Sequence, residues 1–485
     1  MVDVTVVGSG PNGLAAAVTA ARAGLSVRVL EAAPTLGGGV RTGELTLPGF
    51  RHDVCSAVHP AAMASPFFQE FGLTERIDWI VPEVSYAHPL DGGMAGVAWR
   101  DLDRTVDALG RDGPAWRRLI APMLKRLPEI VDFTGSPLVR FPPHPLAALV
   151  YGLRAFEQGT PLWNTRFTGD VAPALLSGVI AHAAGRQPSL ATAGAGLLLA
   201  MHAHGGGWGF PVGGSQAIAD VLVADLLEHG GSVHTGVMVE SLAELEPSRV
   251  TLLDTSTRLL LDADIPSGYR RALERYRYGS GVAKVDFALS GPVPWANSDV
   301  RLAPTVHLGG SRAEIAAGEN AVARGRMPEH PYVLATQPTV LDPSRAPAGQ
   351  HVLWAYIHVP KWSTLDATEL VTAEVERFAP GFRDLILATA SSSAKELADY
   401  SPNYVGGDIY SGAVTLRQLV KRPVVSAQPW RTPLAGVYLC SSATSPGPAV
   451  HGMNGWYAAK LALRERFGIE APISLGVGPP GGPRA

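Results

Sequence analysis

The sequence predicts an α/β protein in which a Rossmann-like dinucleotide-binding domain is interleaved with an α+β domain that contains an antiparallel sheet. Three observations predict this architecture. A strand, a glycine turn and a helix open the chain, and a second strand, loop and helix occupy residues 437–463. Between them lie β-branched and aromatic runs broken by Pro and Gly, as in residues 331–360, which are typical of antiparallel strands.

The opening unit has the spacing of a dinucleotide site. Val4 to Val7 form a strand pattern, Gly8, Gly10 and Gly13 follow, and residues 14–23 have an alanine-rich helical pattern. Gly8 permits a tight turn and Gly10 lets a pyrophosphate approach the backbone. Gly13 lets the helix pack closely on the strand, so that the first helical amides face the anion. The unit predicts a dinucleotide and leaves NAD and FAD both open.

An acid and a second glycine-rich segment come next. Glu31 ends the following strand, where its carboxylate can accept hydrogen bonds from both ribose hydroxyls of an adenosine. With Gly38, Arg41 and Thr42 after it, the chain resembles the superfamily of FAD-dependent amine oxidases and phytoene desaturases, in which an acid precedes a Gly-Gly-x-x-Arg-[Ser/Thr] segment. The resemblance implies FAD, with Arg41 beside its diphosphate. Gly39 stands where many members of the superfamily carry Arg.

The resemblance recurs near the end of the chain. The segment VYLCSSATSPGPAVHGMNGWYAAKLAL matches the closing flavin motif of the superfamily. The match implies that the turn places a helix N-terminus against the pyrimidine edge of the flavin, where backbone amides stabilise negative charge on the reduced ring. His451 is either a proton shuttle beside the flavin or a loop residue that packs on the cofactor. The predicted cofactor contacts in this turn are Val450, Gly452, Met453 and Asn454.

A third match lies in residues 205–242, which contain a Trp-x-x-Pro-x-Gly-Gly turn, a helix and a strand. In relatives this strand presents a backbone amide to adenine, and the matching position is Val239. Residues 250–256, VTLLDTS, are predicted to be the strand that returns to the cofactor sheet.

Lys284 is the predicted redox residue. It is a lysine in an otherwise apolar strand pattern, GVAKVDFAL. In amine oxidases a lysine at the matching position holds a water against flavin N5, where a positive charge favours reduced flavin. The alternative is a solvated lysine on a half-buried strand.

The three flavin motifs fall in separated parts of the chain, so one glutathione reductase-type cofactor domain is expected to be assembled from three pieces. The segments between them are expected to form a substrate domain over the flavin. The predicted FAD-binding domain comprises residues 1–60, 205–289 and 425–468, the substrate domain comprises 61–204 and 290–424, and 469–485 form a flexible tail.

Over nearly its full length the chain most resembles the phytoene desaturase-like branch, which includes pyridine nucleotide-disulphide oxidoreductase domain-containing protein 2. The resemblance implies a FAD-dependent dehydrogenase, desaturase or oxidase that takes a hydride from a largely apolar, isoprenoid-like substrate with noncovalent FAD. Two alternatives stay open: a flavin amine oxidase that produces hydrogen peroxide, and a non-redox carrier of lipids or prenylated proteins on the same fold.

The composition excludes several classes of binding partner. A net charge of −3 leaves no basic footprint for nucleic acid. Cys55 and Cys440 form no metal or disulfide pattern and are expected to be small buried apolar residues, and His202 and His204 lack further ligands for a metal. Residues 190–201 are too short to cross a bilayer and are expected to form a buried helix or part of an apolar entrance. We expect a cytoplasmic protein, with peripheral membrane contact and oligomeric state left open.

Overall fold

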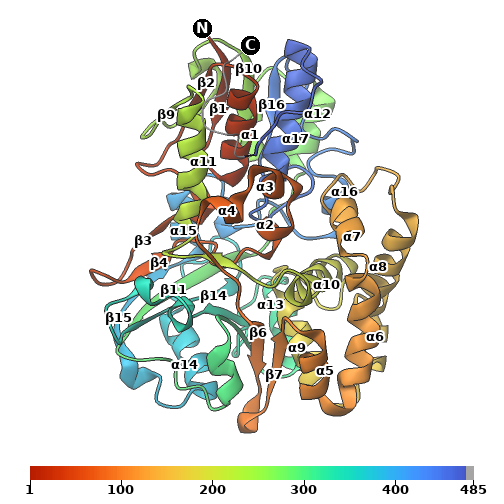
Figure 1. Ribbon diagram of the computed structural model, residues 1–485, viewed down its shortest axis with the longest axis vertical. Helices are drawn as coiled ribbons and strands as arrows, with labels where there is room; N and C mark the ends of the chain where they lie inside the picture. The colour runs from red at the N-terminus through yellow and green to blue at the C-terminus, as the bar shows by residue number, and fades with distance from the viewer. Residues whose placement is uncertain (477–485) are drawn as a thin grey trace.

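The computed structural model describes residues 1–476, which form two sheets and a helical lobe that meet around one cavity (Figure 1). Both sheets and the Rossmann-like unit agree with the predicted fold class. The smaller sheet carries the glycine turn, and the larger sheet and the helical lobe enclose the space beside it.

The first sheet has five parallel strands in the order β16-β10-β1-β2-β9. In a doubly wound sheet, ligands bind beyond the carboxyl ends of the strands where the strand order reverses, and here that point lies between β1 and β10. The strand predicted at residues 250–256 does lie in this sheet as β10, although it ends at Leu253. The strands are β1 (Val2–Val7), β2 (Val27–Leu30), β9 (Ser232–His234), β10 (Ser248–Leu253) and β16 (Val437–Leu439).

Helices cover both faces of this sheet. On one face, α1 packs between α11 and α17, and the Phe-rich α3 adds Phe67, Phe68 and Phe71 to the same core. On the other face, Leu260, Ile265 and Leu273 of the α12 region pack on β1, β10 and β16. The helices are α1 (Pro11–Arg22), α3 (Pro66–Phe71), α11 (Gln216–Glu228), α12 (Ser267–Glu274) and α17 (Met453–Ala462).

The second sheet has seven strands in the order β15-β11-β14-β13-β12-β6-β7, antiparallel except where β6 pairs with β12. Because β11 lies in this sheet, the range 205–289 contributes to both sheets rather than to the cofactor sheet alone. The strands are β6 (Val84–Pro89), β7 (Ala95–Trp99), β11 (Gly281–Leu289), β12 (Thr305–Leu308), β13 (Val333–Thr336), β14 (His351–Val359) and β15 (Ile386–Ser392).

The two faces of the seven-stranded sheet have different neighbours. Side chains of α14 (Thr368–Phe378) fill one face together with Ala283, Val285 and Phe287 of β11. On the opposite face, Val282 packs with Trp354 and Tyr356, which line the cavity. The alternation of side chains along β11 therefore decides which of its residues face the cavity. Also packed around this sheet are α13 (Arg312–Val322) and α15 (Ala394–Tyr400).

The helical lobe has its own core, in which Trp116, Leu119, Leu176 and Leu197 are fully buried. It lies at the right of Figure 1, with α8 on its outer side. Its helices are α5 (Leu102–Ala108), α6 (Gly113–Leu124), α7 (Leu127–Thr134), α8 (Pro145–Gln158), α9 (Val171–Ala181) and α10 (Leu190–His204). The remaining elements are α2 (Pro60–Ala64), α4 (Leu73–Arg76), α16 (Leu416–Val420) and the strand pairs β3 (Thr42–Glu44) with β4 (Arg51–Asp53) and β5 (Trp79–Ile80) with β8 (Phe210–Pro211).

Within residues 1–476, no helix combines the length and the apolar character that crossing a bilayer requires. Of the expected tail at 469–485, residues 477–485 lie outside the described part of the chain. Leu475 is buried in the core that packs on the five-stranded sheet, and the carbonyl of Ser474 accepts a hydrogen bond from Arg22. The first part of that segment therefore packs on the domain.

Candidate cofactor and substrate site

The glycine turn between β1 and α1 is shaped by close backbone approaches. Gly8 has a φ of +97°, and a Cβ on Gly10 would lie 2.5 Å from the Asp254 carboxylate. A Cβ on Gly13 would lie 2.2 Å from the Gly8 carbonyl oxygen, so this glycine lets α1 pack against the turn. Gly8 and Gly10 line the cavity, whereas Gly13 does not. Pro11 at the start of α1 has no N–H and the Gly13 N–H donates to Asp254, so among the first three residues of the helix the Asn12 N–H stays available to an anion.

Glu31 is held rigidly at the cavity wall. One carboxylate oxygen accepts hydrogen bonds from the backbone N–H and the hydroxyl of Ser9, and the other accepts one from the Ala33 N–H at 2.9 Å. The Arg41 guanidinium lies 3.0 Å from the same carboxylate. This network fixes the Glu31 carboxylate at the end of β2, where it is predicted to contact the ribose of the cofactor.

The segment after Glu31 divides into residues on the cavity wall and residues behind it. Gly38 and Arg41 line the cavity, and Arg41 also donates a hydrogen bond to the Tyr400 hydroxyl at 2.9 Å. Thr42 is not part of the wall. Its hydroxyl donates to Asp53 at 2.7 Å and accepts from the Gln216 N–H, so it joins β3 to β4 and α11.

Val239 lies in an irregular segment after β9 rather than in a strand, and it lines the cavity. The segment is tied to the site because the Val237 N–H donates to the Glu31 carbonyl at 2.9 Å. Its place beside the Glu31 end of the cavity is consistent with the predicted contact to adenine.

Asp254 is a site residue that the sequence analysis missed. It follows the last residue of β10, is 8% exposed and accepts a hydrogen bond from the Gly13 N–H at 2.9 Å. Burial, together with the nearby charge of Glu31, raises the pKa of this carboxyl to about 7. The signal was present, because an acid directly after a parallel strand of the cofactor sheet lies at the binding edge.

The closing turn brings one predicted residue to the wall and places the others behind it. Val450 lines the cavity. The Met453 N–H donates to Nδ1 of His451 at 3.0 Å, and the Asn454 amide donates to the Thr444 carbonyl at 2.9 Å. Gly452 begins α17 with a φ of +66°, where a Cβ would lie 2.6 Å from the Phe67 ring. His451 is buried in this turn, and burial lowers its pKa to about 4, so the ring is neutral at neutral pH.

Lys284 is buried, which rules out the solvated alternative. It lies on the cavity-side face of β11, its ammonium donates to Asp286, and Nζ is 5.8 Å from the centre of the Trp354 ring. Trp354 lines the cavity and Lys284 does not, so the ammonium lies one layer beneath the wall. Burial raises the pKa of Asp286 to about 6, although the ammonium of Lys284 opposes this shift. The positive charge of Lys284 can therefore act on the cavity only through the layer of wall residues above it.

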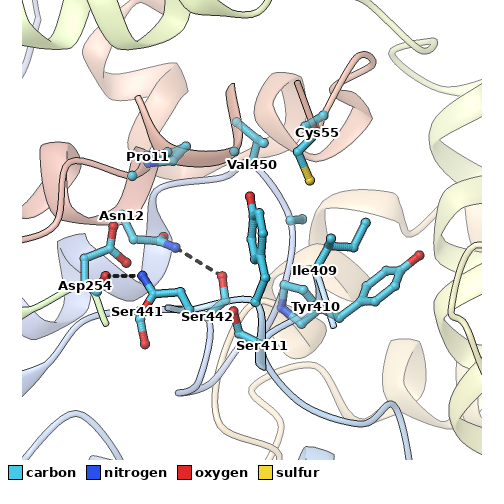
Figure 2. Close-up of a pocket in the computed structure, with 18 of the residues that line it drawn as sticks. Pro11, Asn12, Cys55, Asp254, Ile409, Tyr410, Ser411, Ser441, Ser442 and Val450 are labelled. Carbon is cyan, nitrogen blue, oxygen red and sulfur yellow. Dashed lines mark hydrogen bonds between the residues drawn. The ribbon is translucent and has the colours of Figure 1, made fainter. Parts of the chain in front are cut away.

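One cavity of about 1640 Å³ joins the glycine turn to an apolar chamber. Figure 2 shows Asn12 and Asp254 at one end and Cys55, Ile409 and Tyr410 at the other. Residues from α8, α10 and α16 form the chamber wall, and the hydroxyls of Tyr356 and Tyr410 lie 3.0 Å apart within it. The expectation for residues 190–201 is confirmed, since α10 lines the chamber. Cys55 differs from expectation because it is only half-buried and lies on this wall.

The chain is similar in sequence to known proteins, both in its opening segment and over nearly its full length. Residues 6–71 match the family model described as an NAD(P)-binding Rossmann-like domain. The chain is homologous to pyridine nucleotide-disulfide oxidoreductase domain-containing protein 2 of Rattus norvegicus, at 25% identity over 96% of this chain and 93% of that protein. The corresponding mouse protein matches at 24% identity.

Solved structures show the fold. A putrescine oxidase variant superposes with a TM-score of 0.61 at 16% identity, over 96% of this chain and 99% of the other. Cyclohexylamine oxidase from Brevibacterium oxydans gives a TM-score of 0.56 at 16% identity, over 96% and 99% of the two chains. These structures confirm the fold class predicted from the sequence, and the matches to pyridine nucleotide-disulfide oxidoreductase domain-containing protein 2 agree with the predicted resemblance.

Proposed function

We propose that the protein is a FAD-dependent oxidoreductase that takes a hydride from a largely apolar small molecule. The observation that carries the proposal is one continuous cavity that runs from the glycine turn into an apolar chamber. A dinucleotide requires the part of the cavity beside the glycine turn. The apolar chamber offers a separate space for a substrate beside the flavin.

The residues on the wall fit FAD. Gly8 and Gly10 leave a backbone cradle that a Cβ would fill, and Oδ1 of Asn12, in the first turn of α1, is buried without a hydrogen-bond partner in the described part of the chain. Glu31 and Val239 would hold the adenosine, the Asn12 N–H at the start of α1 would face the diphosphate, and Val450 would contact the flavin. When bound, FAD supplies the hydride acceptor, flavin N5.

The residues of the chamber position the substrate and exclude water from it. The chamber wall of α8, α10 and α16 excludes water from an apolar substrate, and Tyr356 and Tyr410 add two hydroxyls that can orient one polar group. We propose noncovalent attachment of FAD. In its support, burial raises the pKa of the Cys55 thiol, which keeps this wall residue a weak nucleophile.

A second candidate is a flavin amine oxidase that releases hydrogen peroxide. It is favoured by the fold shared with amine oxidases and by the aromatic side chains Trp354, Tyr356 and Tyr410 on the wall, since a cationic amine is attracted to aromatic faces.

The test has two parts. Organic-soluble material carried through purification is identified by mass spectrometry, and molecules of the class found are then mixed anaerobically with the FAD-loaded protein. Bleaching of the flavin absorption by an apolar molecule supports the proposal. Bleaching only by amines, with peroxide formed in air, supports the second candidate. A protein that retains apolar molecules but binds no flavin would be a non-redox carrier.

A further inference from the structure

Helix α8 presents an apolar face to solvent. Leu146, Leu149, Leu153 and Phe156 are 54%, 57%, 57% and 53% exposed. Their spacing of three and four residues places them on one side of the helix. The two charged residues of α8, Arg154 and Glu157, pair with each other, and Glu157 also pairs with Arg166, so the acid at the end of this helix is neutralised. Single exposed leucines are ordinary on a monomer, but a contiguous row of this kind marks an interaction site.

The exposed face of α8 is continuous with the chamber. Phe156 belongs both to this face and to the cavity wall. Leu190 of α10 and Leu416 of α16 are likewise exposed and line the cavity. We call these residues, with the exposed Leu146, Leu149, Leu153 and Phe141, the apolar rim. Figure 1 shows α8 and α16 on the same side of the molecule. The rim therefore surrounds a route from the surface into the chamber.

Charge distinguishes this surface from a site of self-association. The segments 136–156, 182–204 and 411–425, which carry the rim, contain no Asp or Glu. Exposed Arg186 and Arg417 and half-buried Lys421 have no ion-pair partner among residues 1–476. A second copy of the chain would bring the same cations against each other. An apolar face bordered by unpaired cations instead complements a bilayer that contains anionic lipids.

We propose that the apolar rim docks on the surface of an anionic lipid bilayer and that an apolar substrate enters the chamber directly from it. Docking rests on the rim alone, and the delivery of substrate rests on the proposed function. Leu149 and Leu153 would enter the acyl region, while Arg186, Arg417 and Lys421 would contact lipid phosphates. This route spares an apolar substrate from passing through water.

The test is flotation of the full chain with vesicles of phosphatidylcholine containing about 30% phosphatidylglycerol. We expect the wild type to float with these vesicles. The double variant Leu149→Glu/Leu153→Glu should lose about tenfold or more of the bound fraction, because two charges would enter the acyl region. Neither residue lines the cavity, so flavin content should not change.

Two comparison variants sharpen the result. Leu387→Glu changes a 46% exposed leucine on β15, on the opposite side of Figure 1 from α8, and should float like the wild type. Arg417→Gln/Lys421→Gln should lower binding to anionic vesicles and reduce its dependence on salt. Equal thermal unfolding of all variants is the check on folding.

The proposal is overturned if the wild type does not float, if Leu149→Glu/Leu153→Glu floats equally well, or if Leu387→Glu loses as much binding. A wild-type dimer that this double variant converts to a monomer would assign the rim to a second copy instead. Flotation needs no flavin, so vesicle binding without flavin would refute the proposed function alone, and flavin reduction without vesicle binding would refute docking alone.

Discussion

Replacing Asp254 by Asn tests whether a buried, neutral carboxyl supports the glycine turn. Asn keeps an oxygen for the Gly13 N–H and removes the acid. The pKa of Asp254 is raised from 3.8 to about 7. Between these values the folded protein holds a proton that the unfolded chain has lost, so the free energy of unfolding falls as pH rises through this window. At about 1.4 kcal/mol per pH unit, the loss reaches about 4 kcal/mol above pH 7.

The Asp254→Asn variant has no carboxyl at this position, so its free energy of unfolding does not fall with pH for this reason. Relative to the wild type, its stability should therefore improve by about 4 kcal/mol between pH 4 and pH 8, whatever constant offset the amide introduces. The assay is urea unfolding of both proteins without added FAD across that range. A stability difference that stays flat with pH would refute the argument, because it would mean that Asp254 ionises normally in the folded protein.

Asp53 provides the matched control with the opposite sign. It is also buried, but an ion pair with Arg345 at 2.8 Å and hydrogen bonds from Ser215 and Thr42 outweigh burial and hold its pKa below the usual range. Its stabilisation is present above the unfolded pKa and is lost as pH falls through the folded one. Asp53→Asn should therefore destabilise the protein at pH 7 and less so in acid.

Three further predictions concern the cofactor. Glu31→Gln should weaken FAD binding about tenfold or more, because charge-assisted hydrogen bonds contribute about 1.5–3 kcal/mol each; unchanged affinity in a titration of the apoprotein would mean that Glu31 is not at the ribose. Lys284→Met, with Asp286→Leu to avoid a stranded buried carboxylate, should retain FAD but slow reoxidation of the dithionite-reduced protein in stopped flow, whereas equal rates would make Lys284 a structural partner only. His451→Gln should leave the pH profile of that reoxidation between pH 5 and 8 unchanged, since burial keeps the histidine neutral there; loss of an apparent pKa would identify it as a proton shuttle.

The glycine turn could be predicted from sequence because all its requirements are local. Gly8, Gly10 and Gly13 follow a strand and precede a helix at fixed spacing, and each glycine does meet a close neighbour. The strand before Asp254 was predicted to return to the same sheet, but not the strand beside which it would lie, and its pairing of Leu253 with Val7 is what brings Asp254 to the glycine turn. Long-range pairing of this kind has no signature in a short motif.

Lys284 and the closing turn show that a motif predicts a local element but not the contacts that each of its side chains makes. The sequence indicated a lysine in an apolar strand, but not the sheet to which β11 belongs, nor Asp286 as the partner of the ammonium. In the closing turn, Met453 and Asn454 match the motif yet bond to their own turn, so the motif marks the turn rather than each contact. The exposed face of α8 became visible only when its packed side was known.

The most direct test of the central claim is the absorption spectrum of the purified protein before and after acid precipitation. We expect a yellow protein with a flavin band, from which acid releases FAD into the supernatant. Colour that remains in the pellet would contradict noncovalent attachment. A protein that is colourless and stays so after incubation with FAD would contradict the flavin site itself.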